Sequence, residues 1–330
     1  MIKHKSKITD IFYKLSKKYN YPFVVNGIDK GYFIDHKKIK HEFDYGTIYL
    51  NDSKYASIAD NKEESSLLMS KYEILTPKEI VFKNINKDSA ESLCEKINNF
   101  VKQVKFPIII KPLNGRQGNN LFKIESEYEI QDICKKIIKI EDSIIVQEYL
   151  DLDEFRVVML DGEILQMYKR FQPYIVGDGI RDIFTLIKDK NKYFLDKNRN
   201  TIISIYDNQI QIILSKLGYS NNSIPEKDLK IYLSFGKNLS KGGEYEFINA
   251  NSFTNFSSVI KDIFKLTKLR LVGFDIFIKK DLEKINSKDD IVLIEYNASP
   301  DMENNFYYND DYYENLVINY TKIFNAIINK

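Results

Sequence analysis

Three oxygen-bearing side chains at the ends of two apolar segments could hold a divalent cation. Glu295 and Asn297 follow the apolar run 291–294 at spacing i, i+2, which places both side chains on one face of a strand. Asp275 lies in an earlier apolar segment, LVGFDIFI. Carboxylate and amide oxygens suit Mg²⁺, which often takes its other ligands from phosphates. The alternative is an ordinary strand end that turns into the loop at Pro300.

A lysine precedes a glycine-containing loop in the first half of the chain. Lys111 ends the apolar segment FPIIIKP, and the loop LNGRQGNN follows it with Gly115 and Gly118. Such a loop can direct backbone N–H groups at phosphate oxygens. The alternative is a simple hairpin, which is common for Asn-Gly sequences. Lys111 favours an anion site, because a buried ammonium without a counter-charge is costly.

Two arginines flank a predicted hairpin. Asp161-Gly162 is a strong type I′ turn signal, and Arg156 and Arg170 lie at similar distances on either side of it. Both guanidiniums can then point into one cleft. Without carboxylates between them they would repel each other, so the pair predicts a polyanionic ligand. The alternative is salt bridging to Glu163 or Asp151.

The apolar pattern switches between helix and strand periodicity along the chain, which is typical of an α+β protein. Ile8, Ile11, Phe12 and Leu15 follow the spacing of an amphipathic helix. Its lysines would permit a membrane-surface role, but its narrow apolar face favours packing within the protein. Asn61 is the predicted N-cap of a later helix. Further expected elements are strands at 21–25, 31–34, 47–50 and 79–82 and helices at 89–104, 128–140 and 257–269.

Composition narrows the class of protein. The 330 residues are 43% hydrophobic, which is enough for two or three domains. A net charge of +2 does not indicate a nucleic-acid or membrane partner. Cys94 and Cys134 lack C-x-x-C spacing, so a reduced, cytoplasmic protein is expected. No apolar run approaches the ~20 residues that span a bilayer.

The order of these motifs resembles the ATP-grasp superfamily, most closely the ATP-grasp domain of cyanophycin synthetases and of bifunctional glutathione synthetases. The resemblance runs from about Ile58 to Lys330. P-loop and Rossmann motifs are absent from the sequence. The matching segments are IADNKEESSLL, FPIIIKPLNGRQGNN, VQEYLDLDEFRVVMLDGEIL, KRFQPYIVGDGIRDIFTLI, SIPEKDLKIYLSFGKNLSKGG, LVGFDIFI and EYNASP.

The resemblance implies an ATP-grasp fold, in which two α+β lobes grip ATP, here with a short N-terminal α/β lobe. The expected divisions are 1–60 for the N-terminal lobe, 61–150 for the central lobe and 151–330 for the C-terminal lobe with the metal site. It also implies roles for individual residues. Those expected to bind ATP are Lys62 and Lys111 at the phosphates, Gly115, Arg116, Gln117 and Gly118 in the flap, Gln147, Glu148, Tyr149 and Leu150 at adenine, and Glu154 at the ribose.

The metal site and the catalytic cations follow from the same resemblance. Two Mg²⁺ ions, for which Mn²⁺ could substitute, would be held by Asp275, Glu295 and Asn297. Arg156 and Arg170, together with Lys111, would act at the transferred phosphate or at the carboxylate substrate.

The implied activity is that of an ATP-dependent carboxylate–amine ligase, which forms an amide or peptide bond through an acylphosphate and releases ADP. Its partners would be ATP, a carboxylate substrate (an amino acid or a peptide) and an amine acceptor. Phosphoryl transfer creates a good leaving group on the carboxylate, and lobe closure excludes water. The alternatives are a glutathione-synthetase-like ligase, a nucleotide-binding module without ligase activity, and an ATP-grasp phosphotransferase.

Several positions depart from the family pattern. Asn120 replaces a flap glycine, and ASPDMENN lacks the residues that often follow the metal motif, which would suit the module without activity. Gly273 stands where D-alanine–D-alanine ligases have an arginine, which argues against that ligase. The segment before Ile58 is short, so we expect an open cleft for an extended or peptidic acid. Alternatively, a homodimer completes the wall around a small donor.

Overall fold

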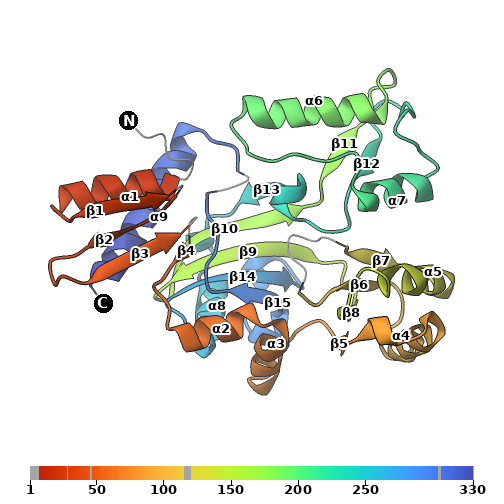
Figure 1. Cartoon of the computed structure of the whole chain (residues 1–330), viewed down its shortest axis with the longest axis horizontal. Helices are drawn as coiled ribbons and strands as arrows, with labels where there is room; N and C mark the ends of the chain where they lie inside the picture. The colour runs from red at the N-terminus through yellow and green to blue at the C-terminus, as the bar shows by residue number, and fades with distance from the viewer. Residues whose placement is uncertain (1–6, 28, 45–46, 115–119, 304–305, 330) are drawn as a thin grey trace.

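The computed structural model describes residues 7–27, 29–44, 47–114, 120–303 and 306–329. Within these residues, three sheets of four or five strands each are flanked by helices (Figure 1). The α-helices are α1 Lys7–Lys18, α2 Ser53–Asp60, α3 Lys62–Lys71, α4 Ala90–Val104, α5 Glu127–Ile137, α6 Ile183–Asp196, α7 Asn208–Lys216, α8 Thr254–Thr267 and α9 Asp310–Ile328. A further pair of strands, β11 Tyr174–Val176 and β12 Lys230–Tyr232, lies near α6 and α7.

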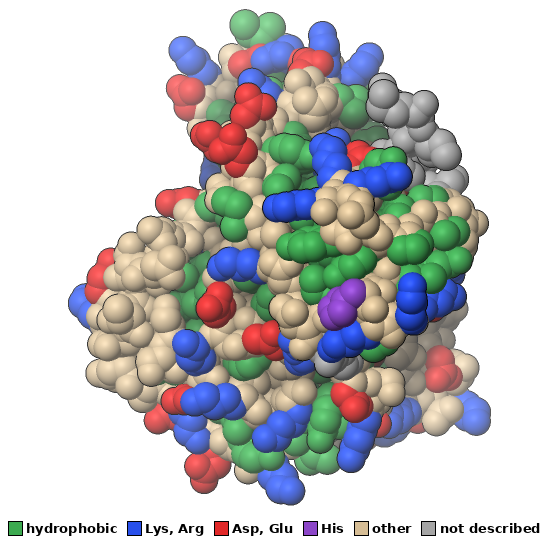
Figure 2. Space-filling model, turned by 90° about the vertical axis from the view of Figure 1, so that its left-hand side faces the viewer, with side chains coloured by type: hydrophobic (Ala, Val, Ile, Leu, Met, Phe, Trp, Pro, Cys, Tyr) green, Lys and Arg blue, Asp and Glu red, His purple; other side chains and the backbone are tan. Residues whose placement is uncertain are grey.

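The N-terminal lobe is an antiparallel sheet covered on one face by α1 and α9. Its strands, in sheet order, are β1 Phe23–Gly27, β2 Lys30–Ile34, β3 Lys40–Asp44 and β4 Thr47–Ile48. The predicted amphipathic helix is confirmed: Phe12 of α1 is buried and packs edge-on against Phe324 of α9, with ring centroids 5.3 Å apart. Strand β3 was not predicted, because only Phe43 of its five residues is buried. Hydrophobic side chains and lysines are mixed on the outward face of this lobe (Figure 2).

The central lobe is a four-stranded sheet backed by α4 and α5. The strands, in sheet order, are β5 Glu79–Phe82, β8 Ile144–Glu148, β6 Ile108–Pro112 and β7 Phe122–Ile124. Side chains alternate across a strand, so Ile108 and Ile110 enter the core beneath the two helices. Ile109 and Lys111 consequently point to the opposite face, toward the cleft.

The C-terminal lobe is built on a five-stranded antiparallel sheet. Its strands, in sheet order, are β13 Glu244–Phe247, β10 Glu163–Phe171, β9 Asp153–Leu160, β14 Leu271–Ile278 and β15 Ile291–Asn297. One face packs on α8. On the other face, Val158 and Leu160 are buried beneath α9 and the N-terminal lobe. The period-2 alternation places Glu154, Arg156 and Asp275 on that same face, farther along the sheet. Glu154 and Asp275 line the cleft there.

Helices α2 and α3 link the N-terminal lobe to the central lobe, but they pack on the C-terminal sheet. Ala59 and Met69 belong to the same core as Phe274 and Tyr296. Asn61 caps α3 as predicted, because its side chain accepts the N–H groups of residues 63 and 64. The division at residue 60 remains a prediction, although α3 shares its core with the C-terminal lobe. No described helix combines the length and apolarity needed to cross a membrane.

Candidate active site

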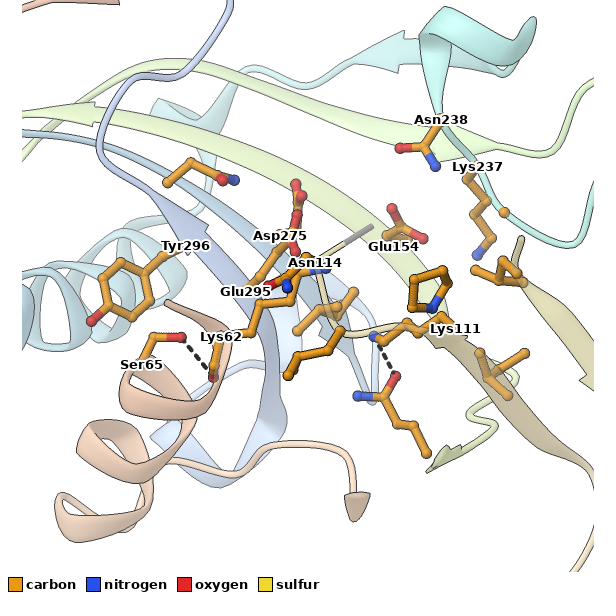
Figure 3. Close-up of a pocket in the computed structure, with 18 of the residues that line it drawn as sticks. Lys62, Ser65, Lys111, Asn114, Glu154, Lys237, Asn238, Asp275, Glu295 and Tyr296 are labelled. Carbon is orange, nitrogen blue, oxygen red and sulfur yellow. Dashed lines mark hydrogen bonds between the residues drawn. The ribbon is translucent and has the colours of Figure 1, made fainter. Parts of the chain in front are cut away.

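The site is a cleft of about 1150 Å³ between the central and C-terminal lobes. Figure 3 shows Asp275 and Glu295 side by side in it, Lys62 extending from α3, and Lys111 on the central sheet. The cleft therefore brings together predicted phosphate and metal residues that are up to 235 positions apart, from Lys62 to Asn297. The predicted residues that line it are Lys62, Lys111, Gln147, Glu148, Tyr149, Leu150, Glu154, Arg170, Asp275, Glu295 and Asn297.

A row of charged side chains crosses the C-terminal sheet. Arg156 on β9 is paired with Asp275 on β14, and Asp275 is paired with Glu295 on β15. Nη1 of Arg156 donates to Oδ1 of Asp275 at 2.8 Å. Both side chains of this pair are 8% exposed. Antiparallel cross-strand neighbours lie close together, so the register itself sets the two carboxylates beside each other.

The two carboxylates have opposite pKa shifts. Burial favours the neutral form of Asp275, but the charges of Arg156 and Arg170 outweigh burial and lower the pKa of Asp275. Burial, and then the negative charge of Asp275, raise the pKa of Glu295. A cation bound between them would compensate the charge of Glu295.

Arg170 contacts two carboxylates at once. Nη1 donates to Oε1 of Glu154 at 3.1 Å, and Nη2 lies 3.1 Å from Oδ1 of Asp275. The premise that the two arginines face each other without carboxylates is therefore wrong. The alternative prediction of salt bridges is confirmed, but the acids differ from those expected. Arg156 pairs with Asp275 on β14, and Arg170 pairs with Glu154 on β9 and with Asp275. Arg156 is buried and, unlike Arg170, is not among the lining residues described for the cleft.

Lys111 lies opposite this row, on the central sheet. Its Nζ donates to Oε1 of Gln147 at 3.1 Å, and Nε2 of Gln147 donates to Oε2 of Glu79 at 2.7 Å. Burial, and then the positive charge of Lys62, lower the pKa of Lys111. Among the described residues, the nearby carboxylates of Glu79, Glu295 and Glu154 offset this shift only in part, and none of them forms an ion pair with the ammonium. This arrangement supports the prediction that the Lys111 ammonium binds an anion, because a buried charge without an ion-pair partner is costly.

The predicted adenine segment forms the edge of the cleft where β8 ends. Gln147, Glu148, Tyr149 and Leu150 all line it. The Glu148 carboxylate accepts the backbone N–H of Lys78 at 2.8 Å, so this side chain is committed to holding the segment in place. The flap residues Gly115, Arg116, Gln117 and Gly118 lie outside the described residues.

Comparisons with known proteins agree with this geometry. Residues 59–174 match the RimK-like ATP-grasp domain. Cyanophycin synthetase of Trichormus variabilis is 26% identical over 281 residues, which are 83% of this chain and 29% of that protein. The bifunctional glutathione biosynthesis protein of Streptococcus agalactiae is 28% identical over 213 residues, which are 62% of this chain and 28% of that protein. The chain thus spans less than a third of either relative's length.

Solved structures agree at the level of the fold. The bifunctional glutathione synthetase from Pasteurella multocida matches with a TM-score of 0.54 at 18% identity, over 89% of this chain and 40% of that one. D-alanine–D-alanine ligase from Bacillus anthracis matches with a TM-score of 0.50 at 13% identity, over 84% of this chain and 69% of that one. This chain has an ATP-grasp fold. The predicted resemblance to ATP-grasp proteins and the predicted α+β fold are confirmed.

The metal ligands predicted for this chain form an all-oxygen set. Asp275, Glu295 and Asn297 all line the cleft. Within the described residues, no group of three or more His, Cys, Asp or Glu side chains could hold a metal ion. Two carboxylates and an amide suit Mg²⁺, which accepts few protein ligands when phosphate oxygens complete its shell. The residues fit the ion in number and type, although the arginines occupy Oδ1 of Asp275.

Sequence reasoning missed the structural role of Gly273. This residue lies on β14 opposite Asn297. A Cβ atom there would be 2.7 Å from Cβ of Pro300 and 2.9 Å from Cζ of Arg156. The guanidinium therefore uses the space beside Gly273 when it reaches Asp275. A glycine within an apolar strand signals such a close approach.

Tyr296 is a second residue that the sequence did not reveal. It borders the cleft beside Glu295, but its ring belongs to the core beneath the sheet. Its hydroxyl is buried without a hydrogen-bond partner among the described residues, and burial raises its pKa to about 12. A tyrosine in an apolar strand looks like an ordinary core residue, so no local signal was available.

Proposed function

We propose that this protein is an ATP-dependent carboxylate–amine ligase that forms an amide or peptide bond through an acylphosphate. One observation carries the proposal: Lys62 and Lys111 share a cleft with Asp275 and Glu295 (Figure 3). The two lysines can bind phosphate oxygens, and the two carboxylates in the same cleft can bind a metal ion. The matches to cyanophycin synthetase and to the bifunctional glutathione proteins support the same class of reaction.

In this proposal, Lys62 and Lys111 hold the phosphates of ATP. Backbone groups of residues 147–150 contact adenine. Glu154 accepts the ribose hydroxyls, which requires it to exchange or share its present hydrogen bond from Arg170. Asp275, Glu295 and the neighbouring Asn297 would hold Mg²⁺, which would neutralise charge on the transferred phosphoryl group.

The chemistry divides one difficult condensation into two displacements. An oxygen of the substrate carboxylate attacks the γ-phosphorus, the bond to the bridging oxygen breaks, and ADP leaves. The amine nitrogen then attacks the acyl carbon, phosphate leaves with its oxygen, and the nitrogen loses a proton. In this proposal, Arg170 and Lys111 contact the phosphoryl oxygens or the tetrahedral oxyanion, where fixed donors are most effective. Arg156 would act through Asp275.

The lining of the cleft bears on the kind of substrate that it would accept. None of the described residues that line the cleft comes from the N-terminal lobe at residues 7–50. An open wall on that side supports an acyl donor with an extended or peptidic body and an amino acid as acceptor. The glutathione-synthetase-like alternative keeps the same chemistry with a small donor, and the comparison with the Streptococcus agalactiae protein supports it.

The decisive experiment measures ADP release with Mg²⁺-ATP and identifies products by mass spectrometry. One arm offers γ-glutamylcysteine with glycine, and the other offers di- and tripeptides with single amino acids. ADP release that needs both an acid and an amine supports a ligase. Turnover restricted to the first arm would replace the extended donor with the glutathione-type substrate. ADP binding without any turnover would favour a nucleotide-binding module, and phosphorylated product without an amide would favour a phosphotransferase.

A further inference from the structure

The carboxylate assigned to the metal ion is already engaged by two arginines. Oδ1 of Asp275 accepts from Nη1 of Arg156 at 2.8 Å and lies 3.1 Å from Nη2 of Arg170. The three side chains are 8–11% exposed. A cation that approaches Asp275 would therefore meet two fixed positive charges and an oxygen whose lone pairs are in use.

Of these three side chains, Arg170 also contacts Glu154, the carboxylate proposed to bind the ribose. The same guanidinium donates through Nη1 to Glu154 at 3.1 Å. Glu154 and Arg170 are directly opposite each other on β9 and β10, and Asp275 lies on β14 on the other side of β9. One planar side chain thus bridges the carboxylate proposed for the ribose and the carboxylate proposed for the metal ion.

This guanidinium still has donor capacity for an anion. Nη1 and Nη2 of Arg170 each carry a second N–H beyond the one directed at Glu154 or at Asp275. Arg170 lines the cleft, whereas Arg156 is buried and is not among its described lining residues, so phosphate oxygens can reach Arg170. An anionic ligand in the cleft would compete with Asp275 for Arg170.

We propose that Arg170 is a positioning residue that makes cation binding at Asp275 depend on the nucleotide, an inference that rests on the proposed function. Without nucleotide, Arg170 holds Asp275 and Glu154 together. The ribose hydroxyls then compete for Glu154, and the phosphates draw the guanidinium away from Oδ1 of Asp275. The cation consequently binds with the nucleotide or after it, and binds weakly alone.

The test measures binding of Mn²⁺ alone, by electron paramagnetic resonance of the free ion, to the parent protein and to Arg170→Met. Methionine keeps the apolar stem and removes the bridge. We expect Arg170→Met to bind Mn²⁺ at least tenfold more tightly. The matched control is Lys237→Met, which removes a cation from the same cleft, where Lys237 donates to the carbonyl of Leu152 at 3.0 Å. The control should stay within threefold of the parent.

A gain below threefold in Arg170→Met, or an equal gain in Lys237→Met, overturns the proposal; a larger gain confined to Arg170→Met supports it. If Arg170→Met does not fold, the double variant Arg170→Met, Glu154→Gln removes the charge that the first change leaves unpaired, and the same thresholds apply. Calorimetric binding of ADP with Mn²⁺ to the parent tests the proposed function separately. Absence of ADP binding overturns both, whereas ADP binding without the Mn²⁺ gain overturns only the role of Arg170.

Discussion

Replacing Gly273 with alanine tests whether space beside β14 is what lets Arg156 reach Asp275. The new Cβ would stand 2.7 Å from Cβ of Pro300 and 2.9 Å from Nη2 of Arg156. Carbon atoms in contact normally lie about 3.5–4.0 Å apart, so the neighbours must withdraw by roughly 1 Å. The guanidinium is the end of a flexible side chain, but it can move only by lengthening its 2.8 Å hydrogen bond to Asp275.

The expected cost combines these two effects. Overpacking a filled site costs about 1–3 kcal/mol, and weakening a buried hydrogen bond between charged groups adds about 1–2 kcal/mol. We therefore expect Gly273→Ala to lower the free energy of unfolding by about 2–4 kcal/mol. The Pro300 ring makes the larger part of this cost hard to avoid, since it moves only with its backbone.

Equilibrium unfolding in urea, followed by far-ultraviolet circular dichroism, suits a chain that has no tryptophan. The control is Gly27→Ala, where an added Cβ would meet no described atom within 4 Å. That variant should match the parent or gain up to about 1 kcal/mol, because alanine restricts the unfolded chain. If Gly273→Ala loses less than about 1 kcal/mol relative to Gly27→Ala, crowding beside Arg156 is refuted.

Three further predictions address the cleft and the N-terminal lobe. Lys111→Met should weaken ADP binding several-fold in titration calorimetry without lowering the unfolding temperature, because it removes a buried ammonium; unchanged affinity would contradict a phosphate role. Asp275→Asn and Glu295→Gln should each reduce turnover by ~10²-fold or more with unchanged circular dichroism. Turnover within a few-fold of the parent at saturating Mg²⁺ would exclude their metal role. Asp35→Asn should destabilise the protein by about 1–3 kcal/mol at neutral pH. Burial opposes ionisation of Asp35, but hydrogen bonds from His41 and two backbone N–H groups lower its pKa. The stabilisation is therefore present above the ordinary aspartate pKa and is lost as the pH falls through the depressed value, so a pH-independent difference in urea titrations would contradict this account.

Features that depend on neighbouring residues were predictable from the sequence. Asn61 caps α3 because a short polar side chain ahead of a helix reaches the N–H groups of its first turn. Asp161 and Gly162 take φ of 47° and 88°, as the predicted type I′ turn requires. Glu295 and Asn297 both line the cleft, because alternate residues of a strand share a face. Each of these signals lies within a few positions of the residue it places.

The partners of the arginines were decided only by the tertiary structure. Nearby acids at positions 151 and 163 were the carboxylates that the sequence offered to Arg156 and Arg170. The structure instead pairs Arg156 with Asp275, which is 119 positions away. That pairing depends on the register of β9 against β14, which is set by packing Val158 and Leu271 beneath α9 and by packing Phe274 on the opposite face. A shift of one residue would turn Asp275 into the core, so the burial of the whole sheet, rather than any local pattern, determines which charges meet in the cleft.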